Sequence, residues 1–281
     1  MMDFKDLNGT LTVITGGAGI LGRAMALGLA SAGGRTIILD INLEAAEKIA
    51  AEISSSTGTY SLGVQANVLD RASLLAARDI IHKEAGKIDF LINGAGGNSP
   101  SGTTKLEEIQ KDQINDLSGS FFGLEIEGFE RIFDLNFQGT LLPTMVFATE
   151  MVERGKGAIL NVSSLNAFHP LTKIPAYSAA KAAINNFTEW LAVHLAKTGV
   201  RVNAIAPGFF LTNQNRFLLI DEKTGNLSAR GNKIMTGTPM GRFGSPEELA
   251  GPAAFLLSDL SQYITGTVML VDGGYNAYSG V

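Results

Sequence analysis

Short runs of apolar and β-branched residues alternate along the chain with longer segments whose apolar residues recur at helical spacing. The short runs predict strands at residues 11–15, 36–40, 61–65, 90–93, 158–162, 200–206 and 267–271. The longer segments predict helices at about 20–32, 43–54, 71–85, 127–153, 176–198 and 246–257. Because most strand-to-strand connections are long enough for a helical crossover, we expect a parallel sheet with helices on both faces.

Two stretches interrupt this alternation. Residues 97–124 are polar and rich in Gly and Ser, with a short helical pattern around 106–115, and residues 209–244 mix aromatic residues with Thr, Asn and Gly. Each follows a predicted strand end, which is where open α/β sheets bind ligands. Long loops inside a domain are more often lids or binding loops than linkers. We therefore expect residues 1–281 to form one domain, with an insertion at about 97–124 and a substrate lid at about 209–244.

Composition narrows the possible functions. The sequence has no cysteine, which excludes thiolate ligands and cysteine nucleophiles, and its scattered histidines, His82, His169 and His194, indicate no metal site. The net charge of -5 gives no basic footprint for nucleic acid or an anionic membrane. No apolar run approaches the roughly 18 residues of a membrane helix, and the polar start is unlike a signal peptide. The expectation is a cytoplasmic protein that binds neither nucleic acid nor membrane.

The first predicted strand leads into a glycine-rich turn, Gly17-x-Gly19-x-x-Gly22, which is followed by a helical pattern. This is the context of the dinucleotide-binding fingerprint. Glycine suits the turn because a Cβ would keep a pyrophosphate away from the backbone, and the helix N-terminus offers N–H groups to that anion. A glycine turn can also simply pack a helix on a strand. The residues expected to contact a cofactor here are Gly16, Gly17, Gly19, Ile20 and Leu21.

Asp40 ends the second predicted strand, eighteen positions after Gly22. A carboxylate near this spacing accepts hydrogen bonds from the adenosine ribose and repels a 2′-phosphate. NAD(H) is therefore favoured over NADP(H), and the nearby Arg23 keeps NADP(H) open as the alternative. A helix cap or turn residue is the other interpretation of Asp40.

Tyr177 and Lys181 are four residues apart in a predicted helix and therefore share one face. A phenol ordinarily loses its proton near pH 10. A nearby ammonium together with an oxidised nicotinamide would favour the phenolate and lower that pKa, so that Tyr177 could exchange a proton with a reacting oxygen. The same spacing is also common on ordinary helix faces.

Taken together, these motifs resemble the short-chain dehydrogenase/reductase family along nearly the whole chain. Ser164 lies thirteen residues before Tyr177, which is the family's usual interval for its substrate-orienting serine. Asn136 matches the family asparagine that holds a water beside the lysine. The resemblance implies a Rossmann-like, doubly wound α/β fold with a seven-stranded parallel sheet. It also implies a catalytic set of Asn136, Ser164, Tyr177 and Lys181.

Other segments resemble the family's cofactor groove, namely the turn at 93–96, an adenine-side pair at 67–68, and 207–208 with a threonine that bonds the nicotinamide carboxamide. The family pattern has Asn where this chain has Gly94 and Asp where it has Asn67. The glycine spacing around Ile20 also departs from the short members of the family. The cofactor contacts implied by the resemblance are Asn67, Val68, Asn93, Ala95, Gly96, Tyr177, Lys181, Pro207, Gly208 and Thr212.

The resemblance implies reversible oxidation of a secondary alcohol to a ketone, with Ser164 and Tyr177 bonding the oxygen. The two long loops carry amides and arginines, which suits a polyhydroxylated anion such as a sugar acid because arginine matches a carboxylate bidentately. The alternative is that these arginines are solvated or pair with loop carboxylates. His169 and Lys173 either touch the substrate or lie on the surface. The expected substrate contacts are Ser164, Asn166, Tyr177, Asn213 and Arg216.

The loops and residues 273–281 look similar to D-mannonate oxidoreductases of the short-chain type, which interconvert D-fructuronate and D-mannonate. Gluconate or 2-deoxygluconate dehydrogenases and 3-oxoacyl carrier-protein reductases are the enzymatic alternatives. A regulator that senses nicotinamide cofactors without catalysis is the alternative of another class. Family likeness further implies a homotetramer, with residues 127–153 and 176–198 as interface candidates.

Overall fold

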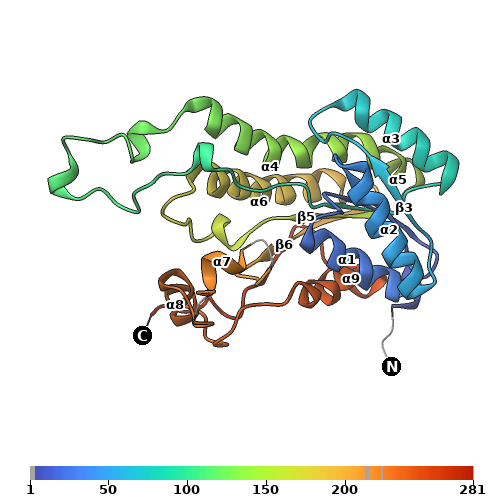
Figure 1. Ribbon diagram of the computed structural model, residues 1–281. Coiled ribbons are helices and arrows are strands. Elements are labelled where there is room, and N and C mark those ends of the chain that lie inside the picture. Colours follow the sequence, from blue (N-terminus) through green and yellow to red (C-terminus); the bar gives the residue numbers. More distant parts are fainter. Residues whose placement is uncertain (1–3, 213–214, 223, 281) are drawn as a thin grey trace.

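A seven-stranded parallel sheet forms the centre of the fold (Figure 1). The computed structural model describes residues 4–212, 215–222 and 224–280. In strand order β3-β2-β1-β4-β5-β6-β7, every neighbouring pair is parallel. The expected doubly wound, Rossmann-like α/β fold is therefore confirmed. The strands are β1 Leu11–Thr15, β2 Arg35–Asp40, β3 Ser61–Gln65, β4 Phe90–Asn93, β5 Gly157–Val162, β6 Val200–Pro207 and β7 Val268–Val271.

Helices cover both faces of this sheet, with α4 and α6 packed together on one face and α1 and α9 packed together on the other (Figure 1). Successive residues of a buried strand point to opposite faces. Val13 accordingly joins the apolar cluster under α4 and α6, while Ile14 joins the cluster under α1 and α9. The helices are α1 Ile20–Ser31, α2 Leu43–Thr57, α3 Arg71–Glu84, α4 Ile126–Phe147, α5 Thr149–Arg154, α6 Pro175–Leu195, α7 Arg216–Leu219, α8 Ala229–Thr236 and α9 Ala250–Leu257.

The structure corrects some of the expected helices. The helix expected at 127–153 is interrupted at Ala148, which ends α4 and precedes α5. The helix expected at 246–257 opens with a 3-10 turn, Pro246–Leu249, before α9. The pattern around 106–115 contains only a 3-10 turn, Lys111–Gln113, with no buried residue. Without a surface to pack against, so short a helical pattern gains too little to form a helix.

The insertion and the segment predicted to form a lid, called the lid segment or lid below, both begin where a strand ends. After β4 the chain enters residues 97–124, which project from the body as a long arm in Figure 1, and after β6 it enters the segment that carries α7 and α8. The backbone N–H of Thr104 in the insertion donates to the carbonyl of Lys173, just before α6 (2.9 Å). The insertion is thus hydrogen-bonded to the segment that leads into α6.

Candidate active site

The glycine turn between β1 and α1 leaves no room for side chains. Gly16 has a φ of 62°, and a Cβ on it would lie 2.8 Å from the Cα of Ala95. A Cβ on Gly17 would lie 2.8 Å from the carbonyl oxygen of Ile14, and one on Gly22 would lie 2.6 Å from that of Gly16. Gly19 is the N-cap of α1, so the first-turn N–H groups of Ile20, Leu21 and Gly22 face the turn. This bare backbone at a helix N-terminus fits a pyrophosphate.

Asp40 stands beside this turn at the end of β2. Its carboxylate accepts hydrogen bonds from the backbone N–H of Ala18 (3.3 Å) and of Asn42 (3.1 Å). The N-cap of α2 is Asn42, not Asp40. A carboxylate has about four lone-pair positions, so Asp40 can brace the turn and still accept bonds from a ribose. Arg23 is the cation that left NADP(H) as the alternative cofactor, and it forms an ion pair with Glu52 through two contacts.

The loop after β4 is held against the same turn. The Thr15 hydroxyl accepts from the N–H groups of Gly94 (3.1 Å) and Ala95 (3.2 Å). A Cβ on Gly94 would lie 2.8 Å from the carbonyl oxygen of Thr15, which explains glycine where the family pattern has Asn. The Asn93 carboxamide donates to Thr144 of α4 and Asn161 of β5 (2.9 and 2.8 Å). Asn93 thus braces the end of β4 between a helix and the next strand.

Asn136 is fully buried in α4 and fastens the next part of that loop. Its carboxamide accepts from the Gly97 N–H (3.1 Å) and donates to the carbonyls of Gly97 (2.7 Å) and Ile132 (2.8 Å). A Cβ on Gly96 would lie 2.6 Å from Asn136 Oδ1 and 3.3 Å from Lys181 Nζ. The structure therefore brings Gly96, Asn136 and Lys181 together, as the sequence predicted.

Tyr177 and Lys181 lie on one face of α6, whose first residue is a proline with a backbone φ already suited to a helix. Lys181 Nζ is 5.5 Å from the centre of the Tyr177 ring and donates to the carbonyl of Val162 (2.8 Å). Ser164 is close enough to the Tyr177 hydroxyl to lower the pKa of that phenol. The buried Ser164 hydroxyl also accepts from the N–H of Asn166 (3.1 Å). Tyr177 thus lies next to both Ser164 and Lys181, two of the other three predicted catalytic residues.

Burial shifts both titratable groups away from their charged forms. Lys181 is 3% exposed, and this burial lowers its pKa from 10.5 to about 7. Burial likewise raises the pKa of Tyr177, and the neighbouring Ser164 side chain opposes that rise. The direction for Tyr177 differs from the expected lowering, because in the protein alone the loss of water around the phenol outweighs any help from the amine. A phenolate here needs further positive charge beside it.

The other residues predicted to contact the cofactor lie in or next to turns that follow the strands. Gly208 donates its N–H to the carbonyl of Val271 (2.9 Å), and the Thr212 N–H donates to the Asn215 side chain (2.8 Å). The Asn67 side chain accepts from the Leu69 N–H (3.0 Å). Two more of the predicted residues are buried, Pro207 at the end of β6 and Val68 against α4. The contacts of these residues with a cofactor stay predictions.

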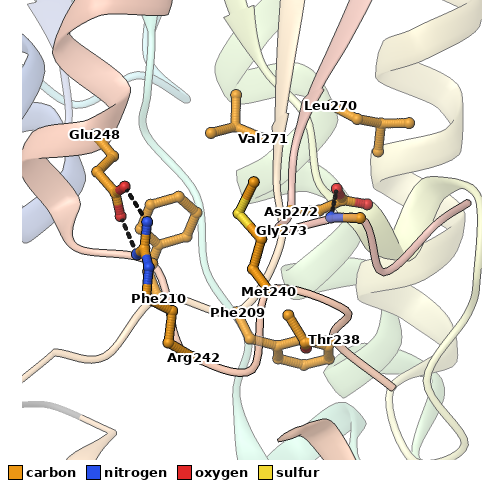
Figure 2. A pocket seen from close by; sticks show the side chains of 12 residues that line it. Phe209, Phe210, Thr238, Met240, Arg242, Glu248, Leu270, Val271, Asp272 and Gly273 are labelled. Carbon is orange, nitrogen blue, oxygen red and sulfur yellow. Dashed lines mark hydrogen bonds and ion pairs between the residues drawn. The ribbon is translucent and has the colours of Figure 1, made fainter. Parts of the chain in front are cut away.

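Two cavities open beside the lid, each of about 370 Å³. The first is shown in Figure 2, where Arg242 is joined by two hydrogen bonds (2.6 and 2.7 Å) to Glu248. This arginine is therefore already paired with a loop carboxylate. The second cavity shares Phe209 with the first and lies between the lid, the insertion and the start of α6. Its lining includes the charged residues Glu107, Lys173, Arg230 and Lys233.

The structure brings three of the predicted substrate contacts together. Ser164, Asn166 and Tyr177 lie together, whereas Arg216 at the start of α7 lines neither cavity. Asn213 lies outside the described residues. Arg230 and Lys233, which line the second cavity, were not among the residues predicted from the sequence, because α8 is too short to give a clear helical period. Within residues 4–212, 215–222 and 224–280, no cluster of His, Asp or Glu is arranged to hold a metal, and no helix has the length and apolarity to cross a membrane.

Comparison with known proteins identifies the protein family to which this chain belongs. The family model described as enoyl-(acyl carrier protein) reductase matches residues 16–276. An uncharacterized oxidoreductase of Haemophilus influenzae is 49% identical over 98% of this chain and 96% of its own length. The chain belongs to the short-chain dehydrogenase/reductase family and is an oxidoreductase of that type.

Two solved structures extend this comparison. A candidate D-mannonate oxidoreductase from Haemophilus influenzae, crystallised with bound NAD, is 49% identical, has a TM-score of 0.92, and matches over 98% of both chains. A gluconate 5-dehydrogenase from Burkholderia cenocepacia in complex with NADP and tartrate is 29% identical, has a TM-score of 0.82, and also matches over 98% of both chains. The chain is therefore similar along its whole length to proteins that differ in bound cofactor.

Proposed function

We propose that this chain is an NAD(H)-dependent oxidoreductase that interconverts a secondary alcohol and a ketone on a small sugar acid, with D-mannonate and D-fructuronate as the substrate pair. The observation that carries the proposal is the contact of Ser164 with Tyr177 beside a buried Lys181. Such a set can bond a reacting oxygen and move a proton to or from it. The glycine turn supplies the matching cofactor cradle.

The preference for NAD(H) is supported by Asp40. A carboxylate at the end of β2 accepts hydrogen bonds from ribose hydroxyls, and its charge repels a 2′-phosphate. Arg23, the cation considered for a 2′-phosphate, forms an ion pair with Glu52, which makes it less available to NADP(H). The similar Haemophilus influenzae structure holds NAD, which agrees with this assignment.

In the proposed mechanism Tyr177 exchanges the proton of the reacting oxygen, and Ser164 holds that oxygen through its hydroxyl. When bound, the nicotinamide supplies or accepts the hydride. Lys181 donates a hydrogen bond to the Val162 carbonyl and lies beside the tyrosine ring. In the proposed mechanism it relays charge or a proton from the tyrosine. Asn136 fixes the Gly97 loop beside this lysine, so the geometry of the relay depends on it.

The sugar-acid assignment rests on the similarity to the candidate D-mannonate oxidoreductase and on the polar, cationic lining near the lid. A gluconate dehydrogenase is the second candidate, because a gluconate 5-dehydrogenase is also similar over the whole chain. Both candidates would react at C5 of a hexonate, and they differ in the configuration at C2, where mannonate and gluconate are epimers. A catalytically silent sensor is disfavoured because Tyr177 and Lys181 are both present and adjacent.

The direct test is NADH oxidation by the purified protein with D-fructuronate, beside 5-keto-D-gluconate and with NADPH in parallel. We expect D-fructuronate with NADH to give the highest kcat/KM. A higher value with 5-keto-D-gluconate would replace the first candidate by the second. Binding of NADH without turnover of any keto acid in the panel would favour the sensor instead.

We also propose a homotetramer that uses α4 and α6. On these helices the rings of Phe137, Phe187, Trp190 and His194 follow one another at 4.9–6.3 Å between centres. Trp190 is 57% exposed and the nearby Val193 is 79% exposed. An apolar row of this kind gains free energy when another subunit covers it.

A further inference from the structure

The second cavity has an unusual charge balance. Three cations, Lys173, Arg230 and Lys233, line it together with one carboxylate, Glu107. The described residues offer Lys173 and Arg230 no ion pair within 4 Å, so the cavity keeps an excess of positive charge. A cavity with this balance attracts an anion.

Two of these cations are placed by the lid helix α8. The Ser228 side chain caps the helix by accepting from the Gly231 N–H (3.0 Å), and the buried Ile234, which also lines the cavity, anchors the helix. Arg230 and Lys233 are three residues apart and therefore share a face. Gly231 lets the helix approach the lid segment closely, since a Cβ there would lie 2.3 Å from the Leu219 carbonyl oxygen.

The carboxylate comes from the insertion. Glu107 forms an ion pair with Lys233 across 126 positions of sequence, with 3.0 Å between Nζ and Oε2. Its pKa is lowered by the hydrogen bond from Lys233 first, and by the charges of Lys173 and Arg230 in addition. All three cations therefore act on one carboxylate, which occupies the place that an anionic ligand would take.

The cavity also reaches the start of the helix that carries the proposed catalytic tyrosine. Ile174, the N-cap of α6, lines the cavity, and Tyr177 lies in the first turn of the same helix. Phe209 and Tyr275, whose rings meet edge to face with 5.2 Å between centres, form an apolar wall. A hexonate carries its carboxylate several bonds away from a reacting secondary carbon. A carboxylate bound among the cations would leave the rest of the hexonate to extend along this wall toward the first turn of α6.

We propose that Lys173, Arg230 and Lys233 form the carboxylate-binding subsite for the substrate, and that Glu107 occupies this subsite until the substrate carboxylate displaces it. The proposal rests on the sugar-acid function proposed above. The Lys233 and Glu107 side chains are 73% and 51% exposed, so water and salt weaken their contact. An incoming carboxylate can replace such a contact, and arginine can bind it with two parallel hydrogen bonds.

Charge-neutral variants on the two sides of the ion pair separate this role from a purely structural one. If the pair only holds the insertion against the lid, Lys233→Gln and Glu107→Gln remove the same contact and shift the KM for D-mannonate in the same direction. If the cations form the subsite, Lys233→Gln raises this KM by about tenfold or more, since a hydrogen bond to a charged group is lost. Glu107→Gln instead lowers it several-fold, because the competing carboxylate is gone.

Two controls complete the experiment. Glu108→Gln neutralises the adjacent exposed carboxylate, which bonds Gln110 (2.8 Å) and lines no part of the cavity, and leaves the KM for D-mannonate as it is. Lys233→Arg keeps the charge and preserves the low KM. Shifts of both glutamine variants in one direction, or none, overturn the subsite while leaving the enzyme's proposed function standing. A wild-type protein that turns over no sugar acid overturns the proposed function, and the subsite with it.

Discussion

Replacing Lys181 by methionine should stabilise the folded protein at neutral pH, even though it removes a proposed catalytic group. Burial lowers the pKa of Lys181 from 10.5 to about 7. Each pH unit of that displacement corresponds to about 1.4 kcal/mol, so burying the charged amine costs about 5 kcal/mol of folding free energy. Methionine carries no charge and fills a similar volume, so the variant avoids this cost.

The stabilisation by Lys181→Met must decrease as the pH rises. Below about pH 7 the amine is charged in both folded and unfolded chains, and the full cost opposes folding. Between about pH 7 and 10.5 only the unfolded protein keeps the proton, so wild-type stability rises with pH and the cost disappears above that window. Methionine also loses the hydrogen bond to Val162, which is worth about 1 kcal/mol. The expected gain is therefore about 3 kcal/mol at pH 7 and near zero at pH 10.

Urea unfolding followed by circular dichroism at both pH values measures this difference. The exposed Lys48 on α2 offers a matched control, and Lys48→Met should change the free energy of unfolding little and equally at the two pH values. An equal loss of stability for Lys181→Met at pH 7 and pH 10 would show that the buried amine carries no such cost. The reasoning from burial to pKa would then be refuted.

Three further variants test the cofactor turn and the assembly. Asp40→Asn keeps the size but not the charge, and should lower the ratio of kcat/KM with NADH to that with NADPH by about tenfold or more; an unchanged ratio contradicts the ribose assignment. Gly22→Ala places a Cβ 2.6 Å from the Gly16 carbonyl oxygen and should destabilise the protein by about 1–3 kcal/mol in urea unfolding, whereas helix propensity alone predicts a gain. Trp190→Asp should yield a smaller species in size-exclusion chromatography, and elution at the wild-type volume would remove α6 from the proposed interface.

The strands were predictable because each is a short, almost fully apolar run bounded by turn residues. The inner strands β1, β2, β4, β5 and β6 are largely buried on both faces and have this signature, whereas the edge strands β3 and β7 are mostly half-buried. The observed ends of β2, β5, β6 and β7 differ from the prediction by one residue. The break at Ala148 was not predictable, because an apolar period continues through it and only tertiary packing separates α4 from α5. The short helices α7 and α8 lack a period long enough to detect.

The candidate site likewise has features that the sequence predicted and features that it did not. Tyr177, Lys181, Ser164 and Asn136 could be found from spacing and family resemblance, and the fold brings them together. The opposing pKa shifts could not, because they depend on how much water burial removes around each group. Pairings between distant segments, such as Lys233 with Glu107, are equally invisible in a single sequence.

Replacing Tyr177 by phenylalanine tests the central claim most directly, since it removes one oxygen atom and leaves the ring and the cofactor cradle in place. The measurement is single-turnover hydride transfer from NADH to the keto acid found active, with NADH affinity determined by fluorescence on the same sample. We predict unaltered NADH affinity and a rate lower by about 10²–10⁴-fold, the usual contribution of a positioned proton donor. Transfer at the wild-type rate would contradict the account, because another group would then have to supply the proton.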